Sequence, residues 1–271
     1  MTNTFGKRLK TMLKVDLKRL FLSRSFYIIV ASCLVAPILI LVMTTMMDGT
    51  VTVDPQTKVE TVIEGFDNVW QIFGSVNDPN AGAGGAEGMA AMDMSLTSMC
   101  NINMLYFAIS ALVCIFVSED FRSGYAKNLF TVRSKKTDYV ISKTIVLNLG
   151  AAFMVIAFTI GALIGGAVSA LPFDMIGFRV GELIMCIISK TILVSVFVPI
   201  YLLMSSIAKQ KLWMSILISM MVGMFLFMMI PMLTPLNSTI INVIICAVGG
   251  IGFGIGIGAI SVAILTKTSL V

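Results

Sequence analysis

Long stretches without a charged residue constrain this chain more than any other feature. Residues 25–47 form a run of 23 without Asp, Glu, Lys or Arg, and residues 212–266 form a run of 55. A helix needs about 20 predominantly apolar residues to cross the hydrocarbon core of a bilayer. Only 12% of the 271 residues are charged, against roughly 25% in an ordinary soluble domain. The sequence therefore predicts an all-α polytopic membrane protein, folded as one transmembrane domain.

The apolar runs predict six transmembrane helices. The run of 55 residues is too long for one span, and prolines and small polar residues interrupt it between Pro231 and Ser238. Such residues end helices and form turns, so two spans are expected there. The predicted spans are 26–47, 94–118, 144–171, 182–207, 212–230 and 240–265.

The distribution of Lys and Arg orients these spans. Sixteen of the 19 basic residues lie before the first span, in 119–143, directly after the fourth span or after the sixth. Residues 48–93 instead carry eight acidic residues and a single base, Lys58. Because Lys and Arg concentrate in cytoplasmic loops, we expect both termini in the cytoplasm and 48–93 outside the cell.

Two further segments are predicted to form amphipathic helices at the membrane surface. Residues 4–25 place leucines and other apolar residues opposite a row of lysines, which is typical of a helix lying in the interface. Asp16 falls inside the apolar sector, where Arg19 is its local basic neighbour. Residues 59–76 also show helical periodicity and predict a helix on the outer surface, followed by a Gly- and Ala-rich tether.

Residues 119–136 are the most densely charged stretch in the inner part of the chain. Read as one helix, they place Asp120 and Lys127 away from an apolar face. That face consists of Phe121, Tyr125, Asn128, Leu129 and Val132. Two interpretations are open: a solvated loop whose bases satisfy the topology rule, or a helix that docks on a partner protein.

Several classes of function are excluded by what the sequence lacks. Histidine is absent, which removes Ser-His and Cys-His nucleophiles and imidazole ligands for zinc. The five cysteines lie in apolar runs without close spacing, so neither a disulfide nor a metal site is predicted. No G-x-x-x-x-G-K-[ST] sequence is present, so the chain has no Walker site for ATP. The sequence has no basic face with interleaved aromatic residues, so a nucleic-acid partner is not predicted.

Lys190 is the one base expected deep inside a span. It lies eight residues into the fourth span, roughly 12 Å from that helix's start at 1.5 Å per residue. A charged group at the bilayer centre costs about 2.5 to 3.5 kcal/mol on insertion scales, and such residues often mark functional sites. The alternative is a lysine that snorkels toward the outer surface.

Two glycine patterns predict close helix packing. Gly161 and Gly165 are four residues apart in the third span, and the string 249–258 places three glycines on one face of the sixth. These are Gly250, Gly254 and Gly258. Glycine at this spacing lets helices approach closely in lipid. A flexible element that moves during transport is the alternative.

Taken together, these features resemble the ABC-2 type permeases, the membrane subunits of bacterial ABC exporters, and among them the bacitracin-resistance and lantibiotic-immunity permeases. The N-terminal amphipathic helix and the six spans with both termini inside are shared. The more specific likeness is in 119–143, where an acid, a glycine, a basic run, an aromatic residue and a lysine recur. Here these are Glu119, Gly124, Arg133 to Lys136, Tyr139 and Lys143.

The resemblance implies that a coupling helix lies in 119–136 and contacts a separate ATPase dimer, which binds ATP and Mg²⁺. The implied contact residues are Glu119, Asp120, Phe121, Arg122, Gly124, Tyr125, Asn128 and Leu129. The chain itself would hold no cofactor or catalytic residue, and it would pair with a second permease, as a homodimer or heterodimer, in the bacterial plasma membrane.

The expected function is export of an amphipathic cargo, which could be a peptide antibiotic, a lantibiotic, another peptide or a lipid. Antibiotic resistance or lantibiotic immunity would be the biological role. Two alternatives come from other classes: an ion-coupled secondary transporter that uses Lys190, and a membrane sensor or scaffold that transports nothing.

Overall fold

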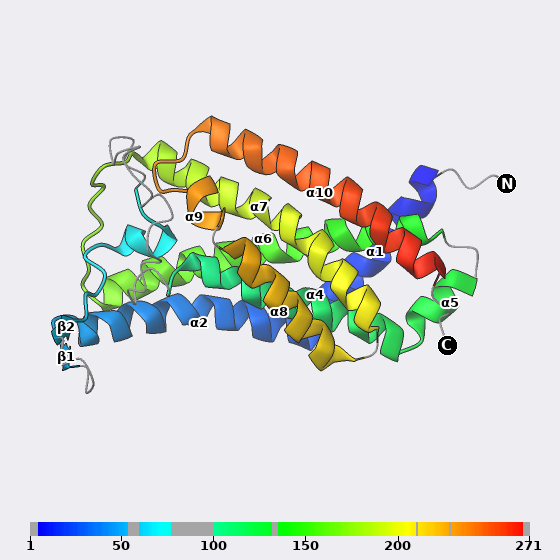
Figure 1. Cartoon of the computed structure of the whole chain (residues 1–271), viewed down its shortest axis with the longest axis horizontal. Helices are drawn as coiled ribbons and strands as arrows, with labels where there is room; N and C mark the ends of the chain where they lie inside the picture. The colour runs from blue at the N-terminus through cyan, green and yellow to red at the C-terminus, as the bar shows by residue number, and fades with distance from the viewer. Residues whose placement is uncertain are drawn as a thin grey trace.

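The computed structural model describes residues 5–53, 60–76, 100–131, 135–209, 211–227 and 229–267. This part of the chain is almost entirely helical (Figure 1). It contains five segments long and apolar enough to cross a membrane. They are α2 (Arg24–Met47), α4 (Leu105–Arg122) with the 3-10 turn η2 (Ile102–Met104) before it, α6 (Lys136–Val168), α7 (Val180–Ala208) and α10 (Ile240–Lys267). The chain therefore has the helices of a multi-pass membrane protein.

Four shorter helices complete the helical part: α1 (Phe5–Leu22), α5 (Tyr125–Thr131), α8 (Leu212–Phe227) and α9 (Met229–Leu233). α8 occupies most of the predicted fifth span but has only 16 residues. At 1.5 Å per residue it is about 24 Å long, which is less than the roughly 30 Å of a hydrocarbon core. α9 follows and ends at Leu233, inside the predicted break, so Pro231 lies within a short helix instead of ending one.

The helices pack in two main pairs around a buried centre. α2 lies along α6, and α10 lies along α7, which also contacts α4. α4, α6 and α7 provide most of the buried residues, whereas only four residues of α10 are buried and most of its exposed side chains are apolar. Exposed apolar side chains suit helices that face lipid rather than water.

Small residues permit the close pairing of α2 with α6. A Cβ built on Gly161 would overlap the carbonyl oxygen of Leu34, and one on Gly165 would lie 2.8 Å from the Cα of Ile38. These distances are too short for any side chain, so both glycines of α6 lie directly against the α2 backbone.

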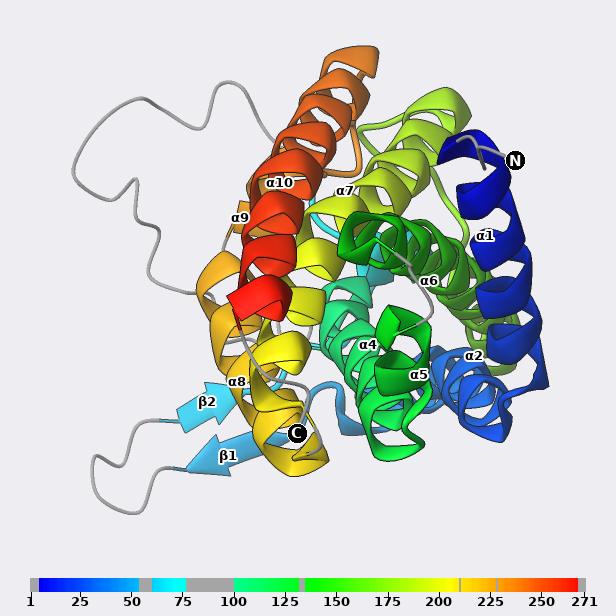
Figure 2. The same cartoon turned by 90° about the vertical axis from the view of Figure 1, so that its right-hand side faces the viewer.

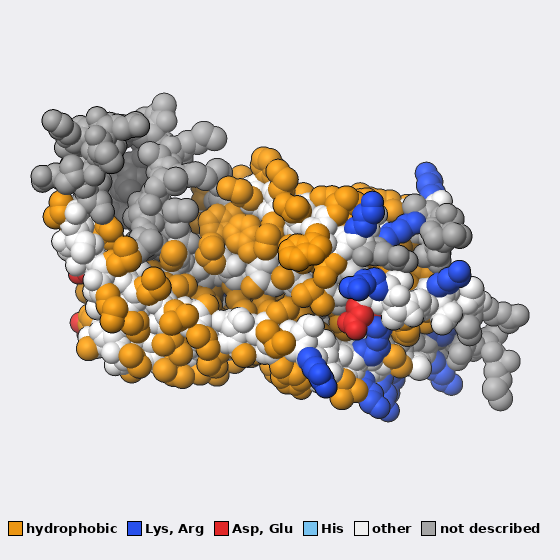
Figure 3. Space-filling view, turned by 90° about the horizontal axis from the view of Figure 1, so that it is seen from below, with side chains coloured by type: hydrophobic (Ala, Val, Ile, Leu, Met, Phe, Trp, Pro, Cys, Tyr) orange, Lys and Arg blue, Asp and Glu red, His pale blue; other side chains and the backbone are white. Residues whose placement is uncertain are grey.

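The two ends of the bundle differ in charge. Figure 1 places the start of α1, the whole of α5 and the end of α10 at one end of the long axis, and β1 and β2 at the other. Lys and Arg side chains gather at the former (Figure 3), which we call the basic end. Figure 2 looks onto this end and shows α1 lying across the ends of α2 and α6.

The opposite end differs from the prediction of an amphipathic helix over 59–76, because residues 60–76, the described part of this segment, do not form one. β2 (Glu60–Val62) pairs antiparallel with β1 (Val51–Val53), and the 3-10 helix η1 (Val69–Phe73) follows. Gly65 separates them, and its N–H donates to Asp48 Oδ1 at 2.9 Å. A Cβ on this glycine would lie 2.9 Å from the carbonyl oxygen of Thr44, so the chain must pass close to the end of α2.

The apolar residues of this segment are used in the interior rather than on a membrane surface. Val69, Ile72 and Phe73 are fully buried, and η1 contacts α6. Asn68 caps η1 by accepting a hydrogen bond from the Trp70 N–H at 3.0 Å. The predicted tether, Lys58 and the first residues of the predicted second span lie outside the described residues.

Candidate functional site

The predicted helix over 119–136 is two helices, so the single-helix prediction is wrong. α4 ends at Arg122, and α5 begins at Tyr125. Gly124 between them has φ +73°, a left-handed conformation that glycine adopts without steric penalty. The chain therefore turns between the helices, while Val132 and Arg133 lie outside the described residues.

The residues implied in partner contact divide into a buried and an exposed group. Asp120 is fully buried, Phe121 is 8% exposed and Tyr125 is half-buried. Gly124 and Leu129 are also partly covered. The exposed group consists of Glu119, Arg122 and Asn128, and Lys127 beside them is exposed as well. The apolar side of the segment is thus covered and its polar side is exposed, at the basic end where Figure 2 shows α5.

Behind α5 lies a cluster of four charged side chains, Asp16 and Arg19 of α1, Asp120 of α4 and Lys143 of α6, which we call the ion network. Lys143 Nζ lies 2.9 Å from Asp16 Oδ1 and 2.7 Å from Asp120 Oδ2. Arg19 Nη1 lies 2.6 Å from Asp120 Oδ1 and 4.0 Å from Asp16 Oδ1. The Arg19 side chain is 27% exposed and the other three are fully buried.

Neutral groups and aromatic rings complete the surroundings of the ion network. Ser142 Oγ donates to Asp16 Oδ2 at 2.7 Å, and Tyr139 Oη donates to Asp120 Oδ2 at 2.9 Å. Lys143 Nζ lies 4.0 Å from the centre of the Phe116 ring, and the Arg19 guanidinium lies 4.0 Å from the centre of the Tyr125 ring. Two cations therefore face two carboxylates, and rings cover both cations.

The ion network joins three helices, and the loss of any one of its charges would leave a buried ion without one of its partners. Taking an ion out of water costs several kcal/mol, which only close pairing and hydrogen bonds offset. Burial lowers the pKa of Arg19, but the charges of Asp120 and Asp16 and the hydrogen bond to Asp120 contribute in the opposite direction and raise that pKa overall, so Arg19 stays cationic. Burial and the charge of Asp16 raise the pKa of Tyr125, which keeps its ring neutral.

A second ion pair fixes α1 to α6 closer to the start of the chain. Arg8 Nε donates to Asp138 Oδ2 at 3.0 Å, and Asp138 is almost fully buried. The two anchoring points lie more than two turns apart on α1. α1 is thereby fixed in direction as well as position across the basic end.

Lys190 is fully inside the protein rather than snorkelling to its surface. It is 1% exposed, and its Nζ donates to Asn103 Oδ1 at 3.0 Å and to Thr234 Oγ1 at 2.8 Å. Tyr106 Oη donates to the backbone carbonyl of Lys190 at 2.9 Å. No ion pair within the described ranges involves this lysine. Lys190 therefore connects η2, which precedes α4, with α7 and with the turn after α9.

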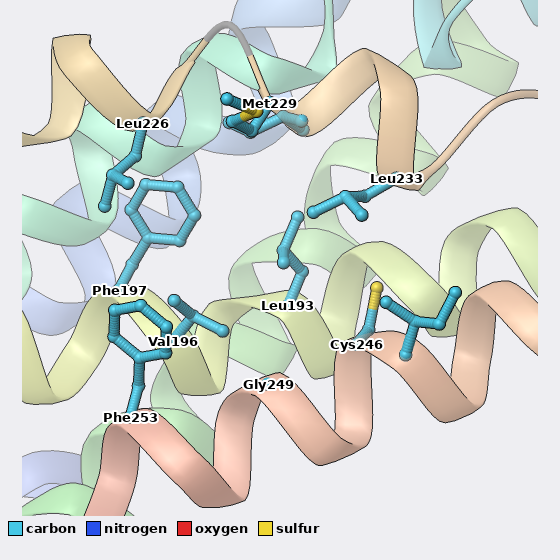
Figure 4. Close-up of a pocket in the computed structure, with 11 residues that line it drawn as sticks. Leu193, Val196, Phe197, Leu226, Met229, Leu233, Cys246, Gly249 and Phe253 are labelled. Atoms are coloured by element: carbon cyan, nitrogen blue, oxygen red, sulfur yellow. The ribbon is translucent and has the colours of Figure 1, made fainter. Parts of the chain in front are cut away.

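An apolar cavity of about 210 Å³ adjoins the Lys190 region between α7, α8, α9 and α10 (Figure 4). Phe197 of α7, Leu226 of α8, Met229 of α9 and Phe253 of α10 line it. Leu193, one turn after Lys190, also lines it. A cavity of roughly 150 Å³ can hold a benzene-sized molecule, so this one accommodates a small apolar group.

The predicted glycine face of α10 is not a uniform contact surface. A Cβ on Gly250 would overlap Ser195 Oγ of α7, so the two backbones approach closely there. Gly258 makes only an ordinary contact, 3.8 Å from Val140 of α6, and Gly254 has no atom within 4 Å of a Cβ position. The packing prediction for Gly254 is therefore wrong within this chain: only the first turn of the glycine string meets α7.

Sequence reasoning missed the ion network and the partners of Lys190. Its one signal was Asp16, an acid on the apolar side of an interfacial helix, for which only Arg19 was considered. Lys143 and Asp120 lie far along the chain from Asp16, and their place in the inner segment 119–143 gives no indication that they pair with it. Asn103 and Thr234 were recognised only as polar residues at a span end and in a break.

The part of the chain that the structure describes offers no group of three or more Cys, Asp or Glu side chains placed to hold a metal ion. The five cysteines are free. The ion network is thus held by the chain's own charges. In comparisons with known proteins, no family model, no curated protein and no solved structure matches this chain.

Proposed function

We propose that this chain is the membrane-spanning subunit of an ATP-driven exporter in a bacterial plasma membrane. It moves an amphipathic cargo, such as a peptide antibiotic, another peptide or a lipid, out of the cell or out of the bilayer. A separate ATPase subunit binds ATP and Mg²⁺, and a second permease subunit completes the transport path. The observation that carries the proposal is the position of α5, whose polar side is free while its other side touches the ion network.

The contacts of α5 support a role in transmitting movement. The Tyr125 ring lies on Arg19, and Arg19 is bonded to Asp120 at the end of α4. Lys143 continues the chain of contacts into α6. A displacement of α5 by closure of the ATPase dimer would thus reach α1, α4 and α6 through direct ionic contacts, not through flexible loops.

The proposed topology has six spans, with α8 and α9 together serving as the fifth. Support comes from the basic end, which holds the start of α1, α5, the link between α7 and α8, and the end of α10. Lys and Arg concentrate on the cytoplasmic side of membrane proteins. The basic end is accordingly the cytoplasmic one in this proposal.

The proposed contact between the ATPase and residues 119–131, which we call the coupling segment, is tested by changing only exposed side chains of this segment. We expect Glu119→Gln, Arg122→Gln and Asn128→Ala together to lower co-purification with the ABC ATPase of the neighbouring reading frame at least tenfold, because few residues carry most of a protein contact. Alanine at Phe121 and Tyr125 is a less specific test, since both side chains also pack internally.

The matched control removes three charges from the exposed side of α1 at the same end, with Lys10→Gln, Lys14→Gln and Lys18→Gln. This variant is expected to retain the ATPase. The docking assignment would be refuted if the coupling-segment variant retained as much ATPase as the control variant. It would also be refuted if no ATPase bound the unaltered chain.

An ion-coupled secondary transporter is the second candidate, and the burial of Lys190 favours it. An ionisable group enclosed at this depth is a usual feature of ion-coupled sites. The two candidates differ in their energy source. In proteoliposomes that hold only this chain, cargo uptake driven by a proton gradient without ATP would establish the second candidate and exclude the first.

A further inference from the structure

A second apolar hollow lies between α6 and α10, close to the basic end. Its volume is about 580 Å³, and it is lined by residues 137–145 of α6 and 251–262 of α10. Its only hydroxyl groups belong to Thr137 and Thr144, and Thr144 Oγ1 already donates to the carbonyl of Val140 at 2.9 Å. We call this hollow the α6–α10 groove.

The glycine string of α10 shapes this groove. Gly254 lines it with no atom within 4 Å of a Cβ position, and Gly258 lines it with Val140 as its nearest neighbour at 3.8 Å. Larger side chains at these positions would occupy the hollow. The glycines therefore create space beside α6 instead of closing the gap between the helices.

The length of the groove limits what can occupy it. Residues 251–262 span about 16 to 18 Å of helix at 1.5 Å per residue. This is roughly half of the 30 Å thickness of a hydrocarbon core. The helix of a second copy would need a surface as long as the whole core, whereas one acyl chain of a phospholipid extends over a single leaflet.

The basic end of the groove carries positive charge. Lys136 directly precedes the lining residues of α6, and its Nζ donates to the carbonyl of Leu265, one turn beyond the last lining residue of α10. Lys135 and Lys267 are exposed beside these two helix ends. Asp138, the acidic residue in the first turn of α6, is buried and paired with Arg8. It therefore does not neutralise these lysines.

We infer that the α6–α10 groove binds an anionic phospholipid, with one acyl chain along Gly254 and Gly258 and the phosphate near Lys136 and Lys267. Van der Waals packing against the apolar walls of the groove accounts for the acyl chain, because contacts inside a membrane depend on packing. Lysines at the membrane surface account for the preference for an anionic head group. This site is independent of the exporter proposal, since it needs neither an ATPase nor a cargo.

The test titrates the purified full chain in mild detergent with phosphatidylglycerol or phosphatidylcholine of identical acyl chains and counts bound lipid by native mass spectrometry. We expect one tightly bound phosphatidylglycerol per chain and at least tenfold weaker binding by Gly254→Leu, which fills the groove. The matched control is Gly252→Leu, an equal change at an exposed glycine of α10 that has open space and does not line the groove. It should bind like the unaltered chain.

The head-group contact is tested separately with Lys136→Gln and Lys267→Gln. Each lysine is expected to contribute about fivefold to the preference for phosphatidylglycerol. Lys127→Gln with Lys211→Gln removes the same charge elsewhere at the basic end and should leave that preference unchanged. Should Gly254→Leu fail to fold, Thr144→Leu fills the groove from α6 instead.

Three results would overturn the inference. One is equal affinity of the unaltered chain for the two lipids. Another is equal lipid binding by the Gly254 and Gly252 variants. The third is loss of a dimer without loss of lipid in Gly254→Leu, since this would make the groove a contact between copies of the chain.

Discussion

The position of Asp16 is explained by tertiary contacts and not by the pattern of its own helix. On its own helix it breaks an apolar face, and nothing nearby except Arg19 compensates for it. In the folded chain it meets Lys143 and Ser142 from α6. A carboxylate in this position is stable only because a distant lysine is delivered to it, so periodicity alone could not assign its role.

Removing one charge from the ion network should show how much the network contributes to the stability of the folded protein. Lys143→Met leaves Asp16 and Asp120 buried with only Arg19 as a cation, and breaking a buried pair costs about 3 to 5 kcal/mol. We expect a loss of this size in unfolding free energy, measured by denaturant titration in detergent. Lys14→Met, on the exposed side of α1, should change it by less than about 0.5 kcal/mol.

A double-mutant cycle separates the ionic effect from lost packing. Adding Asp16→Asn to Lys143→Met removes one of the unpaired carboxylates, so the double variant should be more stable than the sum of the single losses indicates. Strict additivity would show that the two side chains do not interact in the folded protein.

Lys190 should act as a bridge between segments. Lys190→Met removes the donors to Asn103 and Thr234, and an unsatisfied buried polar group costs about 1 to 3 kcal/mol. We expect faster hydrogen exchange in residues 234–239 of this variant, because Thr234 loses the hydrogen bond from Lys190 and keeps only the weaker one from Cys186 Sγ to its carbonyl as a link to α7. Unchanged exchange there, in a variant that folds normally, would mean that Lys190 does not hold this turn.

At the scale of elements, the long helices were predictable and the shorter elements were not. Spans of 20 or more apolar residues leave a backbone in lipid few options other than helix. The break at Gly124 was missed because apolar spacing continues across it, from Phe121 to Tyr125, and an isolated glycine within such a pattern is ambiguous. The segment 60–76 was assigned wrongly because its apolar residues fit an interior as well as a surface.

The pairing of α2 with α6 depends on the absence of side chains at two positions. Gly161→Val would place a Cβ within the Leu34 carbonyl, and overpacking of this kind costs about 1 to 3 kcal/mol. We expect a lower melting temperature in detergent for this variant. Gly256→Val is its counterpart on α10, where a Cβ has open space, and it should melt like the unaltered chain. Equal melting of both variants would contradict the observed pairing.

For the whole molecule, the sequence predicted the membrane class and the grouping of basic residues, and the structure shows how the basic end is assembled. α1 lies across it, and the ion network joins α1 to α4 and α6. α5 contacts this network through the Tyr125 ring, which lies on Arg19. No pattern in the sequence identified that network, because its members come from three separate helices. The exporter proposal depends on this arrangement, since α5 lies at that end with exposed polar side chains on one side and the ion network on the other.

The most direct test of the exporter proposal is site-specific crosslinking in membranes that contain the chain and the neighbouring ABC ATPase. Asn128, exposed on α5, and Gln71, exposed on η1 at the opposite end, are each replaced by a photoreactive residue. The account predicts a crosslink to the ATPase from position 128, strengthened or weakened by ATP, and none from position 71. A crosslink from position 71, or no ATPase adduct from position 128 in a folded protein, would contradict it.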